Sequence, residues 1–422
     1  MGKGGEAPPP ALVDKQPRKT FSSASAWTWI KYGTASVVLF YAIIFATPQP
    51  TTDWEGNVIP RAHKLMGHDA ADIESKPPLD GLVIAVTGAT SGIGLSFTRK
   101  LSSMGAHVIA IGRSSSKLER LAQENEGVST VLVDLNDLDS VAKGADDMLQ
   151  RFDRVDMLVN NAGIHGAVQG MDVSKQGYEQ VFAVNYLSHF LLTEKLMPLL
   201  EKSTQPKTKI IQVSSLYHFG AGISDLRPSK QRDLPASAAP SPIASRPGGA
   251  HGFLLFRDIR SYTNSKLAQV LHAEALNRRF AKSEGQPMEV VSICPSWVGT
   301  SIAGDGLANL FEFIAFESDD YGLASFFEAM LDDDTNTSAV PKFYSNTAHP
   351  ELLVQSMNAL PEWAYSMLPL RDIVGNIFAG YLLIMQRLIP KVGRRAPSAC
   401  VGDIEAQEEL YEWSRGAVQA WL

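Results

Sequence analysis

Tyr262 and Lys266 are the residues whose types and spacing most directly indicate proton-transfer chemistry. They stand four positions apart, so a helix would place both side chains on one face. A phenol with a pKa of about 10 is a poor base near neutral pH. A nearby ammonium group stabilises the phenolate and lowers that pKa, which would let Tyr262 act as a general acid or base. Because such pairs are common in proteins, this one needs further support from the rest of the sequence.

A glycine-rich segment, TGATSGIG at residues 87–94, indicates where a phosphate-bearing cofactor would bind. It follows an apolar run and opens an amphipathic segment, as in the strand–loop–helix units that bind dinucleotides. Glycines permit a tight turn and close approach of the pyrophosphate, while the helix N-terminus supplies free N–H groups. A purely structural turn is the alternative. The expected cofactor contacts in this segment are Gly88, Thr90, Ser91, Gly92, Ile93 and Gly94.

Arg113, which follows the second apolar run, favours NADP(H) over NAD(H). A unit that binds NAD usually carries an acidic side chain at this point, which bonds the ribose 2′-hydroxyl. This chain has Gly112 there, followed by a guanidinium that can pair with a 2′-phosphate. Arg113 could otherwise be a solvated loop residue. At the end of the third run, Asp134 and Leu135 are expected near the adenine, unless Asp134 caps the following helix.

Apolar runs alternate with amphipathic segments between residues 79 and 345, and these elements would position the residues above. Near-continuous runs of Val and Ile, separated by helical patterns, are typical of buried parallel strands. The sequence therefore predicts an α/β fold, a three-layer, doubly wound parallel sheet of the Rossmann type. The expected strands are residues 82–88, 107–112, 128–135, 155–163, 208–215 and 288–295.

Composition argues against two other kinds of site. The net charge of −7 gives no basis for nucleic acid binding. Cys294 and Cys400 are the only cysteines, they form no CxxC motif, and the nine histidines are scattered. We therefore predict neither a disulfide framework nor a metal site.

With its motifs in this order, the chain resembles the classical short-chain dehydrogenase/reductase family, and more narrowly its retinol-dehydrogenase-like branch. The resemblance covers roughly residues 80–345. It implies an NADP(H)-dependent enzyme that interconverts an alcohol and a carbonyl, with the cofactor carrying the hydride. The motifs that carry it are TGATSGIG (87–94), NNAG (160–163), FAVNYLSHFLLTEKLMPLL (182–200), VSS (213–215), YTNSK (262–266) and CPSWVGT (294–300).

The resemblance also implies roles for single residues. Ser215 would orient the substrate oxygen, with Ser214 as the alternative. Asn185 would hold a water that links Lys266 to solvent, or would instead tie a helix to a strand. Thr300 would bind the nicotinamide carboxamide, and Lys266 the ribose. The catalytic set is then Ser215, Tyr262, Lys266 and Asn185, and the further cofactor contacts are Asn160, Asn161, Ala162, Gly163, Pro295, Val298 and Thr300.

Two stretches depart from the family pattern. A Ser/Pro-rich insertion over residues 221–252 lengthens the gap between Ser215 and Tyr262 and reads as a mobile surface loop. Residues 346–400 have no family counterpart, and their apolar run at 373–386 predicts a helical insertion. This insertion could lie in a membrane interface, cap a substrate pocket, or be an ordinary buried helix. Residues 401–422 predict an amphipathic C-terminal helix.

The N-terminal part indicates attachment to a membrane. Residues 1–23 have the composition of a disordered tail, 24–47 predict a transmembrane anchor, and 48–78 a Pro-punctuated linker. A cleaved signal peptide or organelle-targeting segment is the alternative to the anchor. We expect a single-pass protein of the endoplasmic reticulum, with the side of the catalytic domain left open. The sequence also leaves open a homo-oligomer.

Apolar residues in the two inserted stretches, 253–256 and 373–385, favour a small lipophilic substrate such as a retinoid, a steroid or a fatty aldehyde. The alternative for these residues is ordinary core packing. Two rival functions stay open. One is a catalytically inactive nucleotide-binding scaffold or redox sensor. The other is a nucleotide-sugar epimerase, because such enzymes also use a tyrosine and a lysine four residues apart.

Overall fold

Strands form where the sequence places its apolar runs. The computed structural model describes residues 54–165, 173–221, 223–226, 259–295, 322–333, 342–346, 393–395, 397 and 399–422. Each of the first six strands lies within its predicted range, because Val- and Ile-rich runs of this length suit a buried pleated strand. These strands are β1 (Val83–Thr87), β2 (His107–Gly112), β3 (Val128–Leu132), β4 (Met157–Asn160), β5 (Thr208–Val213) and β6 (Met288–Cys294).

The strands join in one sheet with the order β3-β2-β1-β4-β5-β6-β7-β8. Neighbouring strands are parallel from β3 to β7 (Phe343–Ser345), and β8 (Gly393–Arg395) runs antiparallel to β7. The sequence did not predict β7 or β8. The order reverses between β1 and β4, so the loops after these strands leave the sheet in opposite directions. Sheets of this kind bind ligands at the carboxyl ends of the strands, beside such a reversal.

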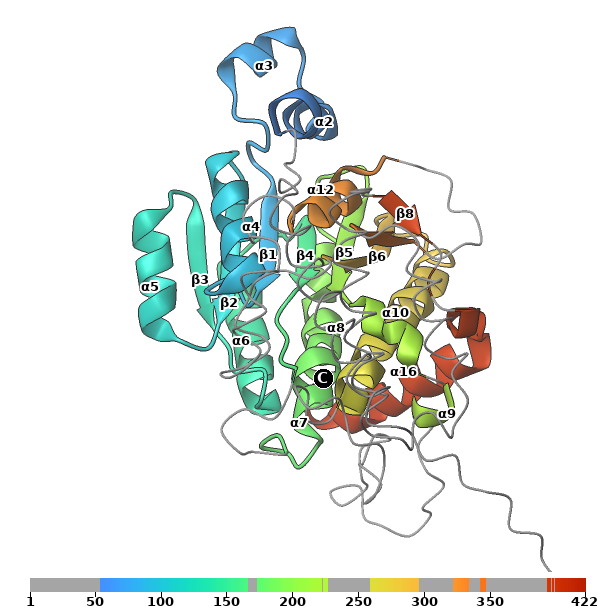
Figure 1. The fold of residues 1–422 in the computed structure, drawn as a ribbon. Coiled ribbons are helices and arrows are strands. Elements are labelled where there is room, and N and C mark those ends of the chain that lie inside the picture. Colours follow the sequence, from blue (N-terminus) through green and yellow to red (C-terminus); the bar gives the residue numbers. More distant parts are fainter. Residues whose placement is uncertain are drawn as a thin grey trace, which may run out of the picture. The chain divides into compact units, whose positions relative to one another are not determined.

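Helices cover both faces of the sheet, which confirms the three-layer, doubly wound prediction (Figure 1). One core lies under α6, α8 and α10, and the other under α4, α5 and α12. Burial of apolar side chains on one stripe of each helix stabilises these layers. The six helices are α4 (Gly92–Ser103), α5 (Ser115–Glu124), α6 (Leu138–Arg151), α8 (Ser188–Leu200), α10 (Ile259–Phe280) and α12 (Ala324–Leu331).

Residues 54–75, which we expected to form part of a linker, are largely helical. They form the π-helical turn η1 (Trp54–Val58), α2 (Ile59–Leu65) and α3 (Ala70–Ser75). Pro60 lies in the first turn of α2, where a missing N–H group costs nothing. Arg61 donates two hydrogen bonds to the carboxylate of Glu328 on α12, at 2.8 and 3.2 Å. This segment is therefore packed onto the catalytic domain, which corrects the linker interpretation.

The helix α16 (Ile404–Val418) lies where we expect an amphipathic C-terminal helix, and it packs against α10 and α8. It is preceded by the 3₁₀ turn η5 (Ala399–Gly402) and followed by η6 (Gln419–Trp421). The guanidinium of Arg279 on α10 lies 3.4 Å from the ring centroid of Tyr411 on α16. Tyr186, beside the predicted Asn185, shares a 2.8 Å hydrogen bond with Ser414. The helix thus supports the elements that carry the predicted catalytic residues.

Several predicted segments fall outside the described residues. They are the tail at 1–23, the anchor at 24–47, most of the insertion at 221–252 and most of the segment at 346–400. Within the insertion at 221–252, α9 (Ile223–Leu226) is described, and the segment at 346–400 contributes β8 near its end. No helix among the described residues has both the length and the apolar character needed to cross a membrane.

Candidate active site

The glycine-rich loop and the turn after β4 meet at the point where the strand order reverses. The hydroxyl oxygen of Thr87, at the end of β1, accepts hydrogen bonds from the backbone N–H groups of Asn161 and Ala162, at 2.9 and 3.0 Å. The side-chain amide of Asn161 donates in return to the carbonyl of Thr87, at 2.8 Å. Asn160 instead donates to Thr193 on α8, at 3.0 Å, so it ties the sheet to that helix.

Two glycines of the loop are required by its geometry. Gly88 has a φ of +69°, which other residues adopt only with strain. A Cβ atom on Gly94 would lie 2.3 Å from the carbonyl oxygen of Gly88 and 2.5 Å from the amide nitrogen of Asn161. The first turn of α4 therefore presses against the loop, and Ser91 makes no side-chain capping bond to it. This leaves the first-turn N–H groups available, which fits the pyrophosphate of a dinucleotide.

The predicted catalytic residues Ser215 and Tyr262 come together. Their side chains share a hydrogen bond, although 47 positions that include the inserted stretch separate them in the sequence. Ser215 begins the 3₁₀ turn η3 (Leu216–Gly220), and Tyr262 lies on α10 with 7% of its surface exposed. Ser214, the alternative, donates instead to the backbone carbonyl of Lys266, at 2.8 Å. The geometry therefore favours Ser215 as the partner of the tyrosine.

Lys266 lies behind Tyr262 on the same face of α10, as the spacing predicts. Its Nζ is 5.4 Å from the centroid of the tyrosine ring and donates to the carbonyl oxygen of Val213, at 2.8 Å. A Cβ atom built on Gly163 would lie 3.6 Å from this Nζ. The lysine therefore lies near both the turn after β4 and the tyrosine.

Asn185 ties the helix before α8 to two other parts of the site. It lies in the π-helical turn η2 (Ala183–Leu187), which follows α7 (Gln180–Phe182). Its amide donates to the carbonyl of Ile164 and to the hydroxyl of Ser265, and its side-chain oxygen accepts from the N–H of Ile164. Single π-helical turns inside helices often occur at functional sites. These contacts agree with the alternative role of Asn185, in which its side chain ties a helix to a strand.

The pKa values of the catalytic pair differ from the sequence expectation. Burial raises the pKa of Tyr262, and the hydrogen bond with Ser215 opposes that rise without reversing it. Burial also lowers the pKa of Lys266 to about 7. A lysine that is only partly charged at neutral pH cannot strongly stabilise a phenolate. In this structure the tyrosine therefore stays protonated near neutral pH, rather than being acidified by its lysine neighbour.

Two aromatic neighbours of Tyr262 lie outside the predicted catalytic and cofactor sets: His165, which the sequence did not single out, and Tyr217, which we interpret from the sequence as a pocket or surface residue. The ring of His165 lies 4.6 Å from the tyrosine ring, centroid to centroid, and the ring of Tyr217 lies 5.8 Å away. Burial lowers the pKa of His165 to about 4, so its imidazole is neutral at physiological pH. His165 follows the NNAG motif by two residues, and only this closeness to the motif could have identified it.

The predicted adenine-side residues lie at the carboxyl ends of β2 and β3. Arg113 is exposed directly after Gly112. Asp134 is also exposed, and its carboxylate accepts from the N–H of Asn136, at 3.0 Å. The residue that caps α6 is Asp137, so the alternative reading of Asp134 as that cap is wrong. Leu135 lies just before α6 and is buried in the core that this helix covers.

The remaining predicted cofactor contacts are only partly described. Pro295 follows β6, and its carbonyl accepts from the side-chain amide of Asn346, at 3.1 Å. Val298 and Thr300 fall outside the described residues. Within the described part of the chain, no three His, Cys, Asp or Glu side chains gather as metal ligands.

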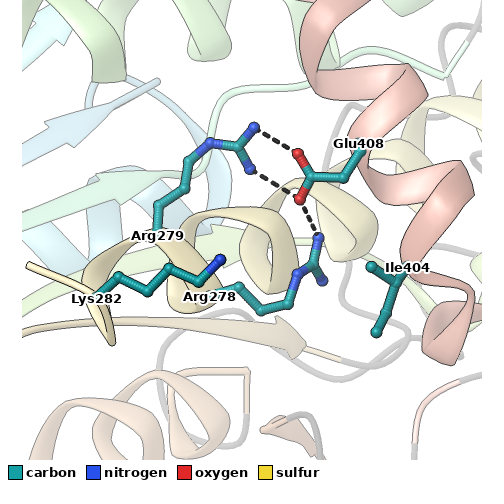
Figure 2. Close-up of a pocket in the computed structure, with 5 residues that line it drawn as sticks. All are labelled: Arg278, Arg279, Lys282, Ile404 and Glu408. Carbon is teal, nitrogen blue, oxygen red and sulfur yellow. Dashed lines mark hydrogen bonds and ion pairs between the residues drawn. The ribbon is translucent and has the colours of Figure 1, made fainter.

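A surface depression of about 550 Å³ lies far from these residues. It is lined by Arg278, Arg279, Lys282, Ile404 and Glu408, and Figure 2 shows both arginines directed at the Glu408 carboxylate. Arg278 is sixteen positions after Tyr262 on the same helix, a rise of about 24 Å. This depression is therefore an ion-paired seam between α10 and α16, and the predicted acid–base residues lie at the other end of α10.

Comparison with known proteins shows what the chain is similar to. A sequence profile described as short chain dehydrogenase matches residues 82–224. Human polyprenol dehydrogenase is 31% identical over 234 residues, which cover 54% of this chain and 63% of that protein. Human retinol dehydrogenase 13 is 29% identical over 236 residues, covering 54% of this chain and 62% of that protein. These comparisons support the resemblance to the short-chain dehydrogenase/reductase family that the sequence motifs indicate.

Within this family, the likeness to retinol dehydrogenase 13 agrees with the retinol-dehydrogenase-like branch. The short chain dehydrogenase/reductase dpchH of Colletotrichum higginsianum is 32% identical over 258 residues, covering 57% of this chain and 61% of that protein. The chain thus spans about three fifths of the length of these curated relatives. The crystal structure of an uncharacterized protein from Mycobacterium paratuberculosis shares the fold, with a TM-score of 0.51 at 22% identity, covering 82% of this chain and 96% of that one.

Substitution of Gly94 by alanine should disrupt the cofactor loop. The new methyl group would meet backbone atoms that cannot move aside alone. We expect Gly94→Ala to lower the stability by about 1–3 kcal/mol and to weaken dinucleotide binding by about tenfold or more. The matched control is Gly416→Ala on α16, where the methyl group meets no atom within 4 Å, and which should gain about 0.5–1 kcal/mol. Thermal unfolding and cofactor titration measure both effects, and an unaltered Gly94→Ala protein would refute this account of the loop.

Burial of Lys266 predicts a pH dependence of stability that Lys266→Met should lack. The pKa of Lys266 falls from 10.5 to about 7 on folding, so the unfolded chain binds the additional proton between these values. The stability of the wild type should rise with pH across that window, relative to the variant. The melting temperature of the wild type, relative to that of Lys266→Met, should rise by about 2–4 °C for each kcal/mol of unfolding free energy that the wild type gains as the pH rises. Lys143→Met, at an exposed position on α6, is the control. Its melting temperature should depend on pH as that of the wild type does. A constant difference between wild type and Lys266→Met would contradict the pKa assignment.

Proposed function

We propose that this chain is a membrane-attached, NADP(H)-dependent oxidoreductase that interconverts an alcohol and a carbonyl. The observation that carries the proposal is the hydrogen bond between Ser215 and Tyr262, with Lys266 behind the tyrosine. A scaffold that binds nucleotides without catalysis has no need of a serine and a tyrosine brought together from distant segments. Similarity to the short-chain dehydrogenase/reductase family supports the same activity.

The residues of the chain divide the reaction between them. When bound, the nicotinamide supplies or accepts the hydride at the reacting carbon. Ser215 donates a hydrogen bond that orients the substrate oxygen. In carbonyl reduction, Tyr262 gives its proton to the forming alkoxide, and in alcohol oxidation the tyrosine oxygen takes the hydroxyl proton. A phenol that stays protonated at neutral pH can serve as the proton donor in carbonyl reduction.

The preference for NADP(H) rests on the residues after β2. Gly112 leaves no carboxylate to bond a ribose 2′-hydroxyl, and Arg113 is exposed beside it. A Cβ atom on Gly112 would lie 3.3 Å from the methyl group of Thr90, so the glycine-rich loop closes over this end of β2. A guanidinium at this position can form a charge-assisted fork with a 2′-phosphate.

A lipophilic substrate is the class that the chain's features favour. The relatives named polyprenol dehydrogenase and retinol dehydrogenase carry long apolar alcohols in their names. The apolar stretches 253–256 and 373–385 lie outside the described residues, and we propose that they shape the substrate pocket. An anchor at residues 24–47 would hold this pocket beside the bilayer, in the endoplasmic reticulum, where retinoids, steroids and fatty aldehydes partition.

Tyr262→Phe tests the acid–base assignment. The variant keeps the ring and its packing but loses the transferable proton, so kcat should fall by about 100-fold or more. NADPH binding should stay within about threefold of the wild type. Tyr178→Phe is the control, because the hydroxyl of this tyrosine donates to the carbonyl of Ala417 on α16. Oxidation of NADPH over a panel of lipophilic aldehydes and ketones gives the rates, and normal turnover by Tyr262→Phe would refute the proposed mechanism.

Arg113→Ala tests the cofactor preference. Loss of the guanidinium should weaken NADPH binding by about tenfold, which corresponds to one charge-assisted pair, and should leave NADH binding nearly unchanged. Lys143→Ala removes an exposed positive charge from α6 and serves as the control for long-range electrostatics. Dissociation constants from fluorescence titration measure the effect. Tighter binding of NADH than of NADPH by the wild type would show the preference to be wrong.

A further inference from the structure

A buried histidine links the cofactor loop to the helix that carries Asn185. His189 lies on α8, one turn after Asn185, and 1% of its surface is exposed. Its Nδ1 is 2.9 Å from the carbonyl oxygen of Asn185. Its Nε2 is 2.9 Å from the hydroxyl oxygen of Thr87, at the start of the glycine-rich loop. The imidazole therefore spans the gap between β1 and α8 with one hydrogen bond at each end.

The partners of the imidazole determine where its proton lies. The carbonyl oxygen of Asn185 can only accept, so Nδ1 must carry the hydrogen. The hydroxyl oxygen of Thr87 already accepts from two backbone N–H groups, those of Asn161 and Ala162. Its own hydrogen is then left to be donated, and Nε2 at 2.9 Å is a closer acceptor than the carbonyl of Val159 at 3.3 Å. A neutral imidazole with its hydrogen on Nδ1 satisfies every atom in this chain of bonds.

A protonated imidazole would break this arrangement. Its second N–H group would face the Thr87 oxygen, which has no lone pair left to accept it. Burial accordingly lowers the pKa of His189 to about 4, and the charge of Lys266 lowers it further, while the bond to Asn185 acts in the opposite direction. The bridge is therefore a fixed feature of the fold near neutral pH.

Each end of the bridge leads to a different part of the site. At one end, Thr87 sets the position of Gly88 and of the turn after β4, where the cofactor is expected. At the other end, the carbonyl of Asn185 also accepts from Gln269 on α10, at 2.9 Å. The side chain of Asn185 bonds Ser265, the neighbour of Lys266. The bridge thus connects the cofactor loop with the helix that carries the acid–base residues.

We propose that His189 is a positioning residue, whose imidazole holds the glycine-rich loop and the acid–base helix in register for hydride transfer. This proposal rests on the oxidoreductase function proposed above. His189 acts through Thr87 and Asn185, and it need not touch the cofactor or the substrate.

Three substitutions at position 189 separate the two ends of the bridge. The amide of His189→Gln reaches the position of Nε2 and can accept from Thr87, but it cannot serve Asn185. The amide of His189→Asn reaches the position of Nδ1 and can donate to the carbonyl of Asn185, but it stops short of Thr87. His189→Leu fills similar space and serves neither partner. These predictions follow from the lengths of the side chains and their donor and acceptor atoms.

The measurements are the dissociation constant for NADPH, by fluorescence titration, and kcat with a lipophilic carbonyl substrate. His189→Leu should weaken NADPH binding and lower kcat by about tenfold each, since each lost positioning bond corresponds to about 1.4 kcal/mol. His189→Gln should keep NADPH binding within about threefold of the wild type and lower kcat. His189→Asn should do the reverse, weakening NADPH binding and largely keeping kcat at saturating cofactor.

His272→Leu is the matched control. His272 is also buried on α10, and it contacts the rings of Tyr186, Phe190 and Tyr411. Its loss should lower the melting temperature and leave both NADPH binding and kcat unchanged. The proposal for His189 is overturned if its variants lower only the melting temperature, or if Gln and Asn impair binding and turnover to the same extent. Should His189→Leu fail to fold, the Gln and Asn variants still decide the question.

The outcome for the wild type separates this proposal from the proposed function. A wild type that binds NADPH but turns over no carbonyl or alcohol refutes the oxidoreductase function. The titration of the Gln and Asn variants then still tests whether the bridge controls the cofactor loop. A wild type that binds no dinucleotide refutes both proposals.

Discussion

One hydroxyl group holds the reactive end of this sheet together. Beyond β1 and β4 the chain leaves the sheet in opposite directions, and the backbone N–H groups of Asn161 and Ala162 lose their strand partners. A buried N–H group without an acceptor costs free energy comparable to a lost hydrogen bond. Thr87 supplies an acceptor for both groups through a single oxygen atom. The N–H of Asn161 also donates to the carbonyl oxygen of Val159, at 3.0 Å. Because the Thr87 oxygen already accepts two hydrogen bonds, its remaining partner must accept the hydroxyl hydrogen. Nε2 of His189 does so, and Nδ1 of the same ring then donates to the carbonyl of Asn185.

Burial has opposite consequences for the two partners of the acid–base pair. Tyr262 keeps its proton more firmly and Lys266 loses its own more easily, since each charged form is poorly solvated inside the domain. The ion pairs described in the chain, such as that between Arg61 and Glu328, are found elsewhere. Burial of Lys266 therefore disfavours its charged form and costs the fold some stability. Such costs are common at sites where a protein carries out chemistry.

Local patterns predicted much of the fold and less of the site. The first six strands and the glycine-rich loop follow from runs of neighbouring residues, so their positions could be predicted. Strands β7 and β8 have three residues each and depend on pairing between distant segments, which leaves no local signal. The helix α2 was missed because Pro60 suggests a break in the chain, although a proline is well accommodated in a first helical turn.

The same distinction applies to the site. Tyr262 and Lys266 are four residues apart, and their shared helix face follows from that spacing. The pKa of Tyr262 depends on how deeply α10 is buried, and this is a property of the whole domain. His165 and His189 owe their places to contacts with residues from other elements. No pattern around either histidine shows that its ring would face the tyrosine or the cofactor loop.

The seam between α10 and α16 has a consequence for how the chain is made. Glu408 lies 130 positions after Arg278, which it binds. At ordinary rates of translation, α10 would leave the ribosome on the order of 10 s before its partner helix is complete. During that interval the apolar side of α10 beneath Tyr411 has no cover. We therefore expect a newly synthesised domain to need a chaperone, or the shelter of a neighbouring surface, until α16 arrives and closes over it.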